Sequence, residues 1–316
     1  MVKELAIRTC GLTKQFERHV AVNDVDLEIP EGEVYGLIGP NGAGKTSLIR
    51  MLAAAEEPTT GEIYINGDRL RLDRSNSQIK RHIGYLPDDY PLYEDLTVWD
   101  YLDYFARLYR LREPRRTHRL HEVLELIQLE NKRHSLISTL SRGMKQRLSL
   151  ARTIIHEPIL LLLDEPVSGL DPIARMQFRQ IIKALQEAGM TILISSHVLS
   201  DLAELCTFVG IMELGFLVES ASLKELYQRL SQPQIILSTL DSLESLEREL
   251  KNYPLVQAWE KISGTNSLRV NFSGTEKDSA DLLRSLIISG VPITNFNCIQ
   301  EDLESIFLKL GHKQAS

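Results

Sequence analysis

The sequence predicts an α/β fold in which helices cover a parallel sheet, together with a helical insertion and a small C-terminal α+β domain. Three observations lead to this prediction. Between residues 160 and 214, short apolar segments alternate with helical ones, as in strand–helix–strand units. Residues 88–156 carry helical patterns and no convincing strand. Residues 235–310 follow the order β-α-β-β-α-β, which is the order of ferredoxin-like domains.

The elements of the first half follow from apolar periodicity. Residues 34–38 are apolar at nearly every position, as a parallel strand buried on both faces should be. From Leu96 onward, apolar residues recur at helical spacing and form one stripe. We predict strands over 20–29, 34–38, 63–65 and 83–86, and helices over 45–55, 96–108, 115–129 and 144–156.

The second half divides at a short polar segment, residues 231–233, which contains a proline. Before it, we predict strands over 160–163, 191–195 and 208–214, and helices over 173–187, 198–206 and 223–230. After it, we predict strands over 235–239, 256–262, 268–272 and 293–298, and helices over 242–251, 276–288 and 301–310. The expected domains are therefore residues 1–230 and 231–316, with the helical insertion at about 88–156.

The composition is that of an ordinary globular chain. Of 316 residues, 43% are apolar and 25% charged, and 36 Lys and Arg against 43 Asp and Glu give a net charge of −7. A nucleic-acid-binding role therefore has no electrostatic support. No apolar run approaches the roughly 18 residues of a transmembrane helix, and the N-terminal residues lack the apolar core of a signal peptide. Three widely spaced cysteines favour a reduced, cytosolic chain: Cys10, Cys206 and Cys298.

A phosphate-binding loop follows the strand over 34–38 and precedes a helix. The segment matches G-x-x-x-x-G-K-[ST] and consists of Gly39, Pro40, Asn41, Gly42, Ala43, Gly44, Lys45, Thr46 and Ser47. Its glycines let successive backbone N–H groups turn toward one anion, and the N-terminus of the following helix faces the phosphates. Lys45 would reach the β- and γ-phosphates, and Thr46 would ligate Mg²⁺. The expected core is therefore that of a P-loop NTPase that binds ATP.

Two carboxylates, Asp164 and Glu165, end the apolar strand over 160–163. At the carboxyl end of a parallel strand, both would face the ligand crevice. Asp164 suits Mg²⁺, and Glu165 suits the general base that activates the water attacking the γ-phosphate. A GTPase would read guanine with NKxD, but residues 131–134 read NKRH and lack the final aspartate. ATP hydrolysis is therefore favoured.

The chain closely resembles the ATP-binding cassette (ABC) ATPases over about residues 3–220. Residues 140–147, LSRGMKQR, are similar to that family's LSGGQ signature. Residues 168–171, SGLD, are similar to its D-loop, and residues 195–197, SSH, end in the position of its switch histidine, His197. Phe16 stands where the family has an aromatic residue that stacks on adenine. Each short motif alone is common, but all of them in this order are specific.

The resemblance implies a head-to-tail dimer that encloses two ATP molecules. In the family, the signature completes the site of the opposite subunit, and Ser141 and Gly143 open a helix whose N-terminus suits an anion. Asp171 of the D-loop belongs to the same set of nucleotide-binding positions.

Two positions depart from the family pattern. Asp88 occupies the place of the Q-loop glutamine; a carboxylate can ligate Mg²⁺, but it is shorter and charged. Arg142 replaces the second glycine of the signature, and Met144 replaces its glutamine. Lys45, Glu165 and His197 are all present, and this argues for an active ATPase.

The resemblance implies an ATP-hydrolysing subunit that powers a membrane transporter, an exporter, by ATP-driven dimerisation and Mg²⁺-dependent hydrolysis. Its partners would be a polytopic membrane permease and a second cassette, in a homodimer or heterodimer. It would lie peripherally on the cytoplasmic face of the cell membrane. The alternative is a soluble ABC-type ATPase that regulates a ribosome or nucleic-acid process. A single cassette, the absence of heptad repeats and the negative charge favour the first function.

Two surface features of the helical insertion have two interpretations each. The aromatic residues between 88 and 108 suit a groove for a short helix of a membrane subunit, but many of them also suit the core of the insertion. The arginines between 107 and 119 would face acidic lipid or a membrane subunit, or simply form a solvated helix face.

Overall fold

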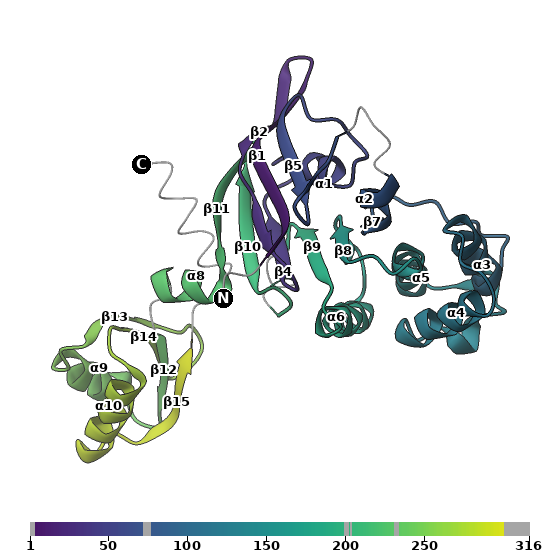
Figure 1. The fold of residues 1–316 in the computed structure, drawn as a ribbon. Helices are drawn as coiled ribbons and strands as arrows, with labels where there is room; N and C mark the ends of the chain where they lie inside the picture. Colours follow the sequence, from purple (N-terminus) through teal and green to yellow (C-terminus); the bar gives the residue numbers. More distant parts are fainter. Residues whose placement is uncertain (1–3, 72–76, 199–201, 203, 231–233, 300–316) are drawn as a thin grey trace. The chain divides into compact units, whose positions relative to one another are not determined.

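The structure, a computed structural model, describes residues 4–71, 77–198, 202, 204–230 and 234–299 (Figure 1). The chain forms two compact units, Met1–Leu223 and Lys224–Ser316. The helix predicted over 301–310 and part of the one predicted over 198–206 lie outside the described residues.

A six-stranded sheet forms the centre of the first unit, in the order β11-β10-β4-β9-β8-β7. Five neighbouring strands are parallel, as the alternation of strands and helices predicts, and β11 pairs antiparallel with β10. All residues of β4, β8 and β9 are buried, which explains their unbroken apolar runs. The bounds are β4 Val34–Ile38, β7 Ile83–Leu86, β8 Leu160–Leu163, β9 Thr191–Ser196, β10 Phe208–Glu213 and β11 Phe216–Ser222.

The parallel register brings the carboxyl ends of three strands together. Ile38 of β4 lies beside Ser196 of β9, and Ile194 of β9 lies beside Leu163 of β8. Helix α1 (Lys45–Leu52) follows β4 and α6 (Pro172–Glu187) precedes β9. The residues after β4, β8 and β9 therefore meet at one edge of the sheet.

A second, antiparallel sheet was not predicted. It contains β1 (Leu5–Phe16), β2 (His19–Val25), β3 (Glu28–Pro30), β5 (Thr60–Ile65) and β6 (Asp68–Arg69). The single strand expected over residues 20–29 is two strands, because β2 pairs with the second half of β1 up to Val25, whereas β3 pairs with the first half of β1 from Glu28 onward. One core cluster joins this sheet to the parallel one.

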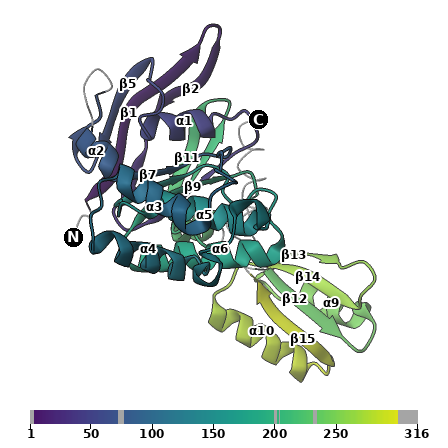
Figure 2. The same ribbon diagram turned by 90° about the vertical axis from the view of Figure 1, so that its right-hand side faces the viewer.

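Residues 88–156 form the expected helical region. Its helices are α3 (Val98–Leu108), α4 (Arg115–Leu126) and α5 (Arg142–Ile154), with short 3₁₀ turns at Glu130–Lys132 and Ile137–Thr139 and with α2 (Ser77–Arg81) before it. Figures 1 and 2 show α3 and α4 beside α5. The N-cap of α3 is Thr97, and Leu102 within the helix is buried.

The arginine-rich stretch at the end of α3 and in α4 is largely engaged in contacts. Arg107 and Arg116 pair with Asp103 at 2.6 and 2.8 Å, and Arg119 donates to the carbonyl oxygen of Ile154 at 2.8 Å. Arg115 pairs with Glu157. These contacts fit a helix face with its own ion pairs.

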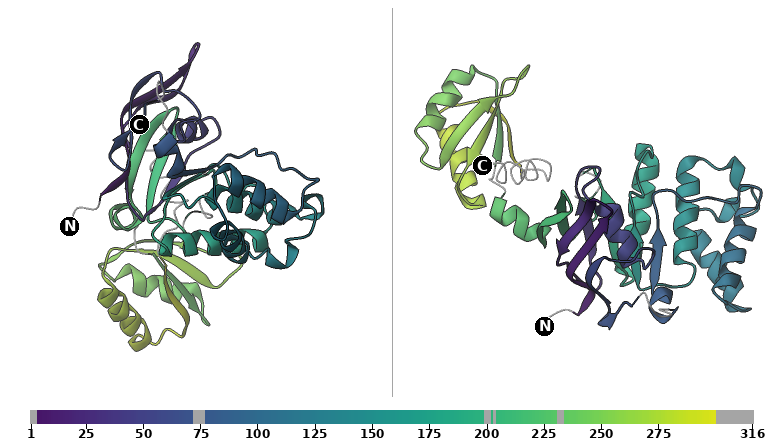
Figure 3. Two further views of the ribbon diagram at one scale, coloured as in Figure 1. Left: turned by 45° about the vertical axis from the view of Figure 1, so that its right-hand side comes forward. Right: turned by 90° about the horizontal axis from the view of Figure 1, so that it is seen from above.

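The second unit has the expected β-α-β-β-α-β order. Its elements after α8 (Leu223–Leu230) are β12 (Gln234–Thr239), α9 (Leu243–Lys251), β13 (Val256–Lys261), β14 (Ser267–Phe272), α10 (Glu276–Ile288) and β15 (Ile293–Ile299). The sheet is antiparallel in the order β13-β14-β12-β15, the split arrangement of ferredoxin-like folds. Leucines of α9 and α10 pack on it, with Leu246 and Leu282 fully buried. Figure 3 shows the ribbon of this unit from two further directions.

Candidate functional site: a phosphate loop facing two carboxylates

The phosphate loop joins β4 to α1 and requires glycine at particular positions. Gly44 is the N-cap of α1 with a φ of 104°, a conformation that residues with a Cβ rarely adopt. A Cβ on Gly44 would also collide with the carbonyl oxygen of Ala21, and one on Gly39 would collide with that of Met212. The loop thus packs tightly against β2 and β10, while Pro40, Asn41, Gly42 and Thr46 are exposed.

Lys45 lies beneath this loop and is only 5% exposed. Its Nζ donates to the carbonyl oxygens of Gly39 and Pro40 at 2.7 and 3.3 Å. The same Nζ lies 3.4 Å from Oε1 of Glu165, with which it forms an ion pair. The ammonium is therefore fixed between the loop and the end of β8.

Glu165 connects the lysine to a histidine. Its Oε2 lies 2.7 Å from Nδ1 of His197, which follows β9. The Glu165 side chain is only 14% exposed, whereas that of His197 is 44% exposed. The Glu165 backbone has a φ of 47°, and its N–H donates to Oγ of Ser195 at 2.9 Å. Three predicted site residues from three separate segments thus form one continuous chain of polar contacts.

Asp164 lies deeper in the same edge of the sheet and is 1% exposed. Its Oδ1 accepts from Oγ of Ser195 at 2.7 Å, and its Oδ2 has no hydrogen-bond partner among the described residues. Burial raises the pKa of Asp164, hydrogen bonding by Ser195 and Thr46 opposes this, and the charges of Glu165 and Asp88 raise it further. The site therefore concentrates negative charge around a buried carboxylate.

These oxygens fit a hard divalent cation. The orphaned Oδ2 of Asp164 and the raised pKa both indicate a position that a positive charge would stabilise. Within the described ranges, no group of three His, Cys, Asp or Glu side chains has the geometry of a complete metal site. Mg²⁺ commonly uses one or two protein carboxylates and completes its shell with water and substrate phosphates.

The sequence did not predict the bridging role of Ser195. The hydroxyl of this serine, near the end of β9, donates to Oδ1 of Asp164 and accepts from the backbone N–H of Glu165. Its only sequence signal was its place at the carboxyl end of a buried strand, directly before Ser196 and His197.

Ser141, Gly143 and Asp171 lie together at the N-termini of two helices. Oγ of Ser141 caps α5 by accepting from the N–H of Met144 at 3.3 Å. Oδ1 of Asp171 caps α6 by accepting from the N–H of Ala174 at 2.9 Å. A Cβ on Gly143 would lie 2.7 Å from Cβ of Ala174, so the two helix ends approach closely. No contact among the described residues joins these three to the phosphate loop of the same chain.

Phe16 ends β1 with 42% of its surface exposed. Nζ of Lys14 lies 4.8 Å from the centroid of its ring, a cation–π contact that the sequence did not predict. The structure leaves Phe16 available for stacking.

The aromatic residues near α3 serve both as core and as surface. Ring centroids of Tyr93, Tyr101, Tyr104 and Phe105 lie 4.9 to 6.2 Å apart. Tyr101 is buried, whereas Tyr93 and Tyr104 are 49% and 44% exposed. Arg152 of α5 lies 5.4 Å from the Phe105 centroid.

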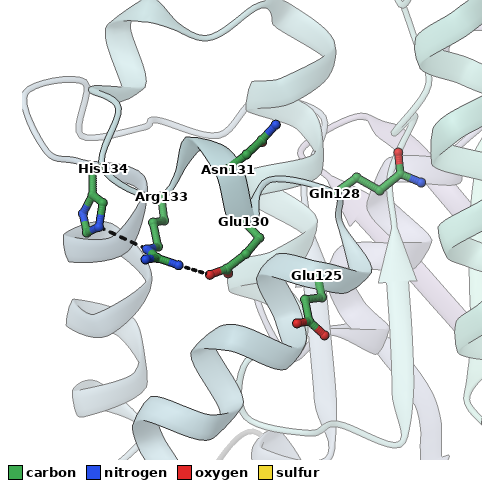
Figure 4. Close-up of a pocket in the computed structure, with 6 residues that line it drawn as sticks. All are labelled: Glu125, Gln128, Glu130, Asn131, Arg133 and His134. Atoms are coloured by element: carbon green, nitrogen blue, oxygen red, sulfur yellow. Dashed lines mark hydrogen bonds and ion pairs between the residues drawn. The ribbon is translucent and has the colours of Figure 1, made fainter.

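A hollow of about 610 Å³ lies on the helical region, at the end of α4 and the turn that follows. Its lining is Glu125, Gln128, Glu130, Asn131, Arg133 and His134 (Figure 4). Arg133 pairs with Glu130, and its Nε lies 3.1 Å from Nε2 of His134. No predicted site residue lines this hollow, so it is separate from the phosphate site.

Comparisons with known proteins find one family and clear relatives. The ABC transporter family matches residues 22–168. The chain is 34% identical over 311 residues to YcbN, an uncharacterized ABC transporter ATP-binding protein of Bacillus subtilis (strain 168), across 96% of each chain. It is 33% identical over 319 residues to the bacitracin transport ATP-binding protein BcrA of Enterococcus faecalis, across 98% of this chain and 97% of that one. A solved dimer of MJ0796, a bacterial ABC transporter cassette, matches with a TM-score of 0.62 and 26% identity, over 69% of this chain and 98% of that one.

Among the residues that the structure describes, no helix is both long and apolar enough to span a membrane.

Proposed function

The chain belongs to the ABC transporter family as an ATP-binding subunit whose ATP hydrolysis is coupled to transport, and from this premise we propose that it powers an exporter. Residues 1–230 form the nucleotide-binding domain in this proposal, and residues 231–316 form an accessory domain. The observation that best supports ATP hydrolysis is a pair of polar contacts, one between Lys45 and Glu165 and one between Glu165 and His197.

The three residues divide the work of hydrolysis. Lys45 binds the β- and γ-phosphates, and its move from Glu165 to a phosphate oxygen leaves the carboxylate free to act on water. Glu165 accepts the proton as the water oxygen bonds to the γ-phosphorus and ADP departs. His197, whose Nδ1 lies 2.7 Å from Oε2 of Glu165, orients that carboxylate. The N-terminus of α1 stabilises the negative charge of the phosphates.

The proposal includes Mg²⁺ held by Thr46 and Asp164, with Asp88 in the place of the Q-loop glutamine. The cation, when bound, neutralises charge on the phosphate oxygens. Asp88 is near enough to raise the pKa of Asp164, which supports its inclusion. Asp88 would add a second carboxylate to the oxygen ligands that hold the cation.

A second copy of the cassette, or a related one, completes each nucleotide site. Ser141 and Asp171 are exposed at helix N-termini, Gly143 is buried beside them, and none of the three has a hydrogen bond to its own phosphate loop among the described residues, so they suit the nucleotide of the opposite subunit. Phe16 stacks on adenine. The dimeric cassette among the similar structures supports this arrangement.

The remaining partner is a polytopic membrane permease, which places the chain peripherally at the cytoplasmic face of the cell membrane. The bacitracin transport relative, similar over nearly its full length, supports a role in transport. Exposed Tyr93 and Tyr104, backed by Phe105, suit the burial of a short helix from the permease.

Phosphate release by the full chain with Mg²⁺ and ATP tests the enzymatic part of the proposal. Lys45→Ala should abolish release because it removes the cation that binds the phosphates. Lys183→Ala is the matched control, since Lys183 is an exposed lysine of α6 away from the site. Equal activity of the two variants would contradict the assignment.

Co-purification from membranes tests the partner. The tagged chain should bring down a polytopic membrane protein. Recovery only with ribosomes or nucleic acid would contradict transport and favour the alternative function.

A further inference from the structure

Arg142 stands where the family's signature has a glycine, and its position needs a local explanation. It is the first residue of α5, directly after the cap Ser141, and its side chain is exposed. The positive end of the helix macrodipole makes this an unfavourable place for a cation. The first turn of α5 contains no acidic residue that would compensate it.

The guanidinium is held by the loop that follows β8. Its Nη2 donates to the carbonyl oxygen of Ser168 at 3.1 Å. A Cβ built on Gly169 would lie 2.5 to 2.6 Å from Nη2, Cζ and Nη1, so the planar group lies directly over the Cα of that glycine. Gly169 also has a φ of 67°. The positive φ is what favours glycine here, because the guanidinium is the far end of a flexible side chain and could shift to make room for a Cβ.

This loop begins at Glu165 and ends at Asp171. The N–H of Ser168 donates to the carbonyl oxygen of Glu165 at 3.1 Å, and Asp171 caps α6. Arg142 holds the middle of the loop, at the residue whose N–H bonds to Glu165. The side chain thus links the N-terminus of α5 to the backbone that carries Glu165.

We propose that Arg142 is a positioning residue that couples the signature segment to the Glu165 loop of the same chain. The coupling rests on the proposed function, in which Ser141 and Gly143 face the nucleotide of the opposite subunit. A shift of the α5 N-terminus on that nucleotide would pull on Ser168 through Arg142 and change the placement of Glu165. A glycine at this position, as in the usual signature, has no side chain that could make this link.

Amide hydrogen exchange of the nucleotide-free full chain measures the link without relying on catalysis. Arg142→Ala should raise the exchange of the Ser168 and Leu170 amides by about tenfold, the effect of losing one charge-assisted hydrogen bond from a local opening equilibrium. Arg142→Lys should give an intermediate value, because an ammonium can donate but cannot lie flat over Gly169. Arg112→Ala should change nothing, since Arg112 is an exposed arginine of the same helical region with no side-chain contact among the described residues.

Steady-state hydrolysis measures the coupling itself. Arg142→Ala should lower kcat by about fivefold, the lower end of typical coupling effects, with KM changed less than twofold. Arg142→Lys should restore part of kcat, and Arg112→Ala should match the wild type.

Two results would overturn the proposal. If the Ser168 and Leu170 amides exchange equally fast in Arg142→Ala and Arg112→Ala, Arg142 does not stabilise the loop. If they exchange faster in Arg142→Ala but kcat is unchanged, the contact does not affect hydrolysis. An inactive wild-type chain would instead contradict the proposed function, and the exchange measurement would still decide whether the link exists.

Discussion

At the scale of single residues, the site depends on contacts between groups far apart in the sequence. Motif spacing predicted that Lys45, Glu165 and His197 meet, because the strands that precede them are parallel neighbours. It did not predict that Lys45 pairs directly with Glu165 or that Ser195 bonds to both acidic residues. These details depend on side-chain rotamers and on the left-handed backbone of Glu165, which no motif encodes.

The two phosphate-loop glycines differ in what surrounds them, and this predicts different effects of substitution. Gly42 has a φ of 83° but no atom within 4 Å of an added Cβ, so Gly42→Ala should lower the free energy of unfolding by about 1 kcal/mol. Gly44→Ala adds a collision with Ala21 to the same backbone strain and should cost about 3 kcal/mol or more. Urea unfolding of the nucleotide-free chain measures both, and equal losses would contradict the role given to Ala21.

The raised pKa of Asp164 predicts a stability effect that depends on pH. Below the unfolded-state pKa, the carboxyl is protonated in both states and its burial has no electrostatic cost. As the pH rises, the carboxyl ionises first in the unfolded state. The folded state therefore becomes less stable relative to the unfolded state until the pH exceeds the folded-state pKa. Asp164→Asn removes this loss, and its Oδ1 can still accept from Ser195.

In the absence of Mg²⁺ and nucleotide, the Asp164→Asn variant should therefore unfold at a higher urea concentration than the wild type at pH 7. At pH 7 the difference in the free energy of unfolding should be about 1.4 kcal/mol for each unit by which the pKa of Asp164 is raised. It should become smaller as the pH falls toward 4. A difference that does not vary with pH would contradict the burial argument.

At the scale of elements, apolar runs identified the buried parallel strands and missed the partly exposed ones. The ranges of β7 and β8 and of α8 agree with prediction, because their apolar patterns are unbroken or clearly helical. Strand β1 was missed because polar residues interrupt it, and it bends where its pairing partner changes from β3 to β2. Strand β11 was missed because none of its residues is fully buried.

The helix caps of the two units allow a matched comparison. Ser141 caps α5 beside the site, and Thr275 caps α10 in the second unit through a capping box. Each replacement by alanine should lower the stability of its helix by about 1 kcal/mol. Only Ser141→Ala should also lower kcat/KM for ATP, because in the proposed dimer only Ser141 contributes to a nucleotide site. Phosphate-release assays at equal folded fraction distinguish the two, and a similar loss in Thr275→Ala would contradict this division of roles.

At the scale of the whole molecule, element order predicted the α/β core, the helical region and the split β-α-β arrangement of the second unit. It could not predict that the first unit contains two sheets joined by one core, because that pairing is long-range and is not expressed in local periodicity. The chemistry belongs to the first unit. The predictions for Thr275 and for the site residues therefore separate stability from hydrolysis.

The central claim is that Glu165 is the base of an ATP-hydrolysing site completed by a second cassette. The most direct measurement compares steady-state phosphate release and ATP-induced dimerisation in wild type and Glu165→Gln. The substitution keeps the size of the side chain and removes its basicity, so hydrolysis should fall by about 10² to 10⁴-fold. Light scattering should still show a dimer of Glu165→Gln in ATP and Mg²⁺. Wild-type turnover in this variant, or a chain that stays monomeric in ATP, would contradict the account.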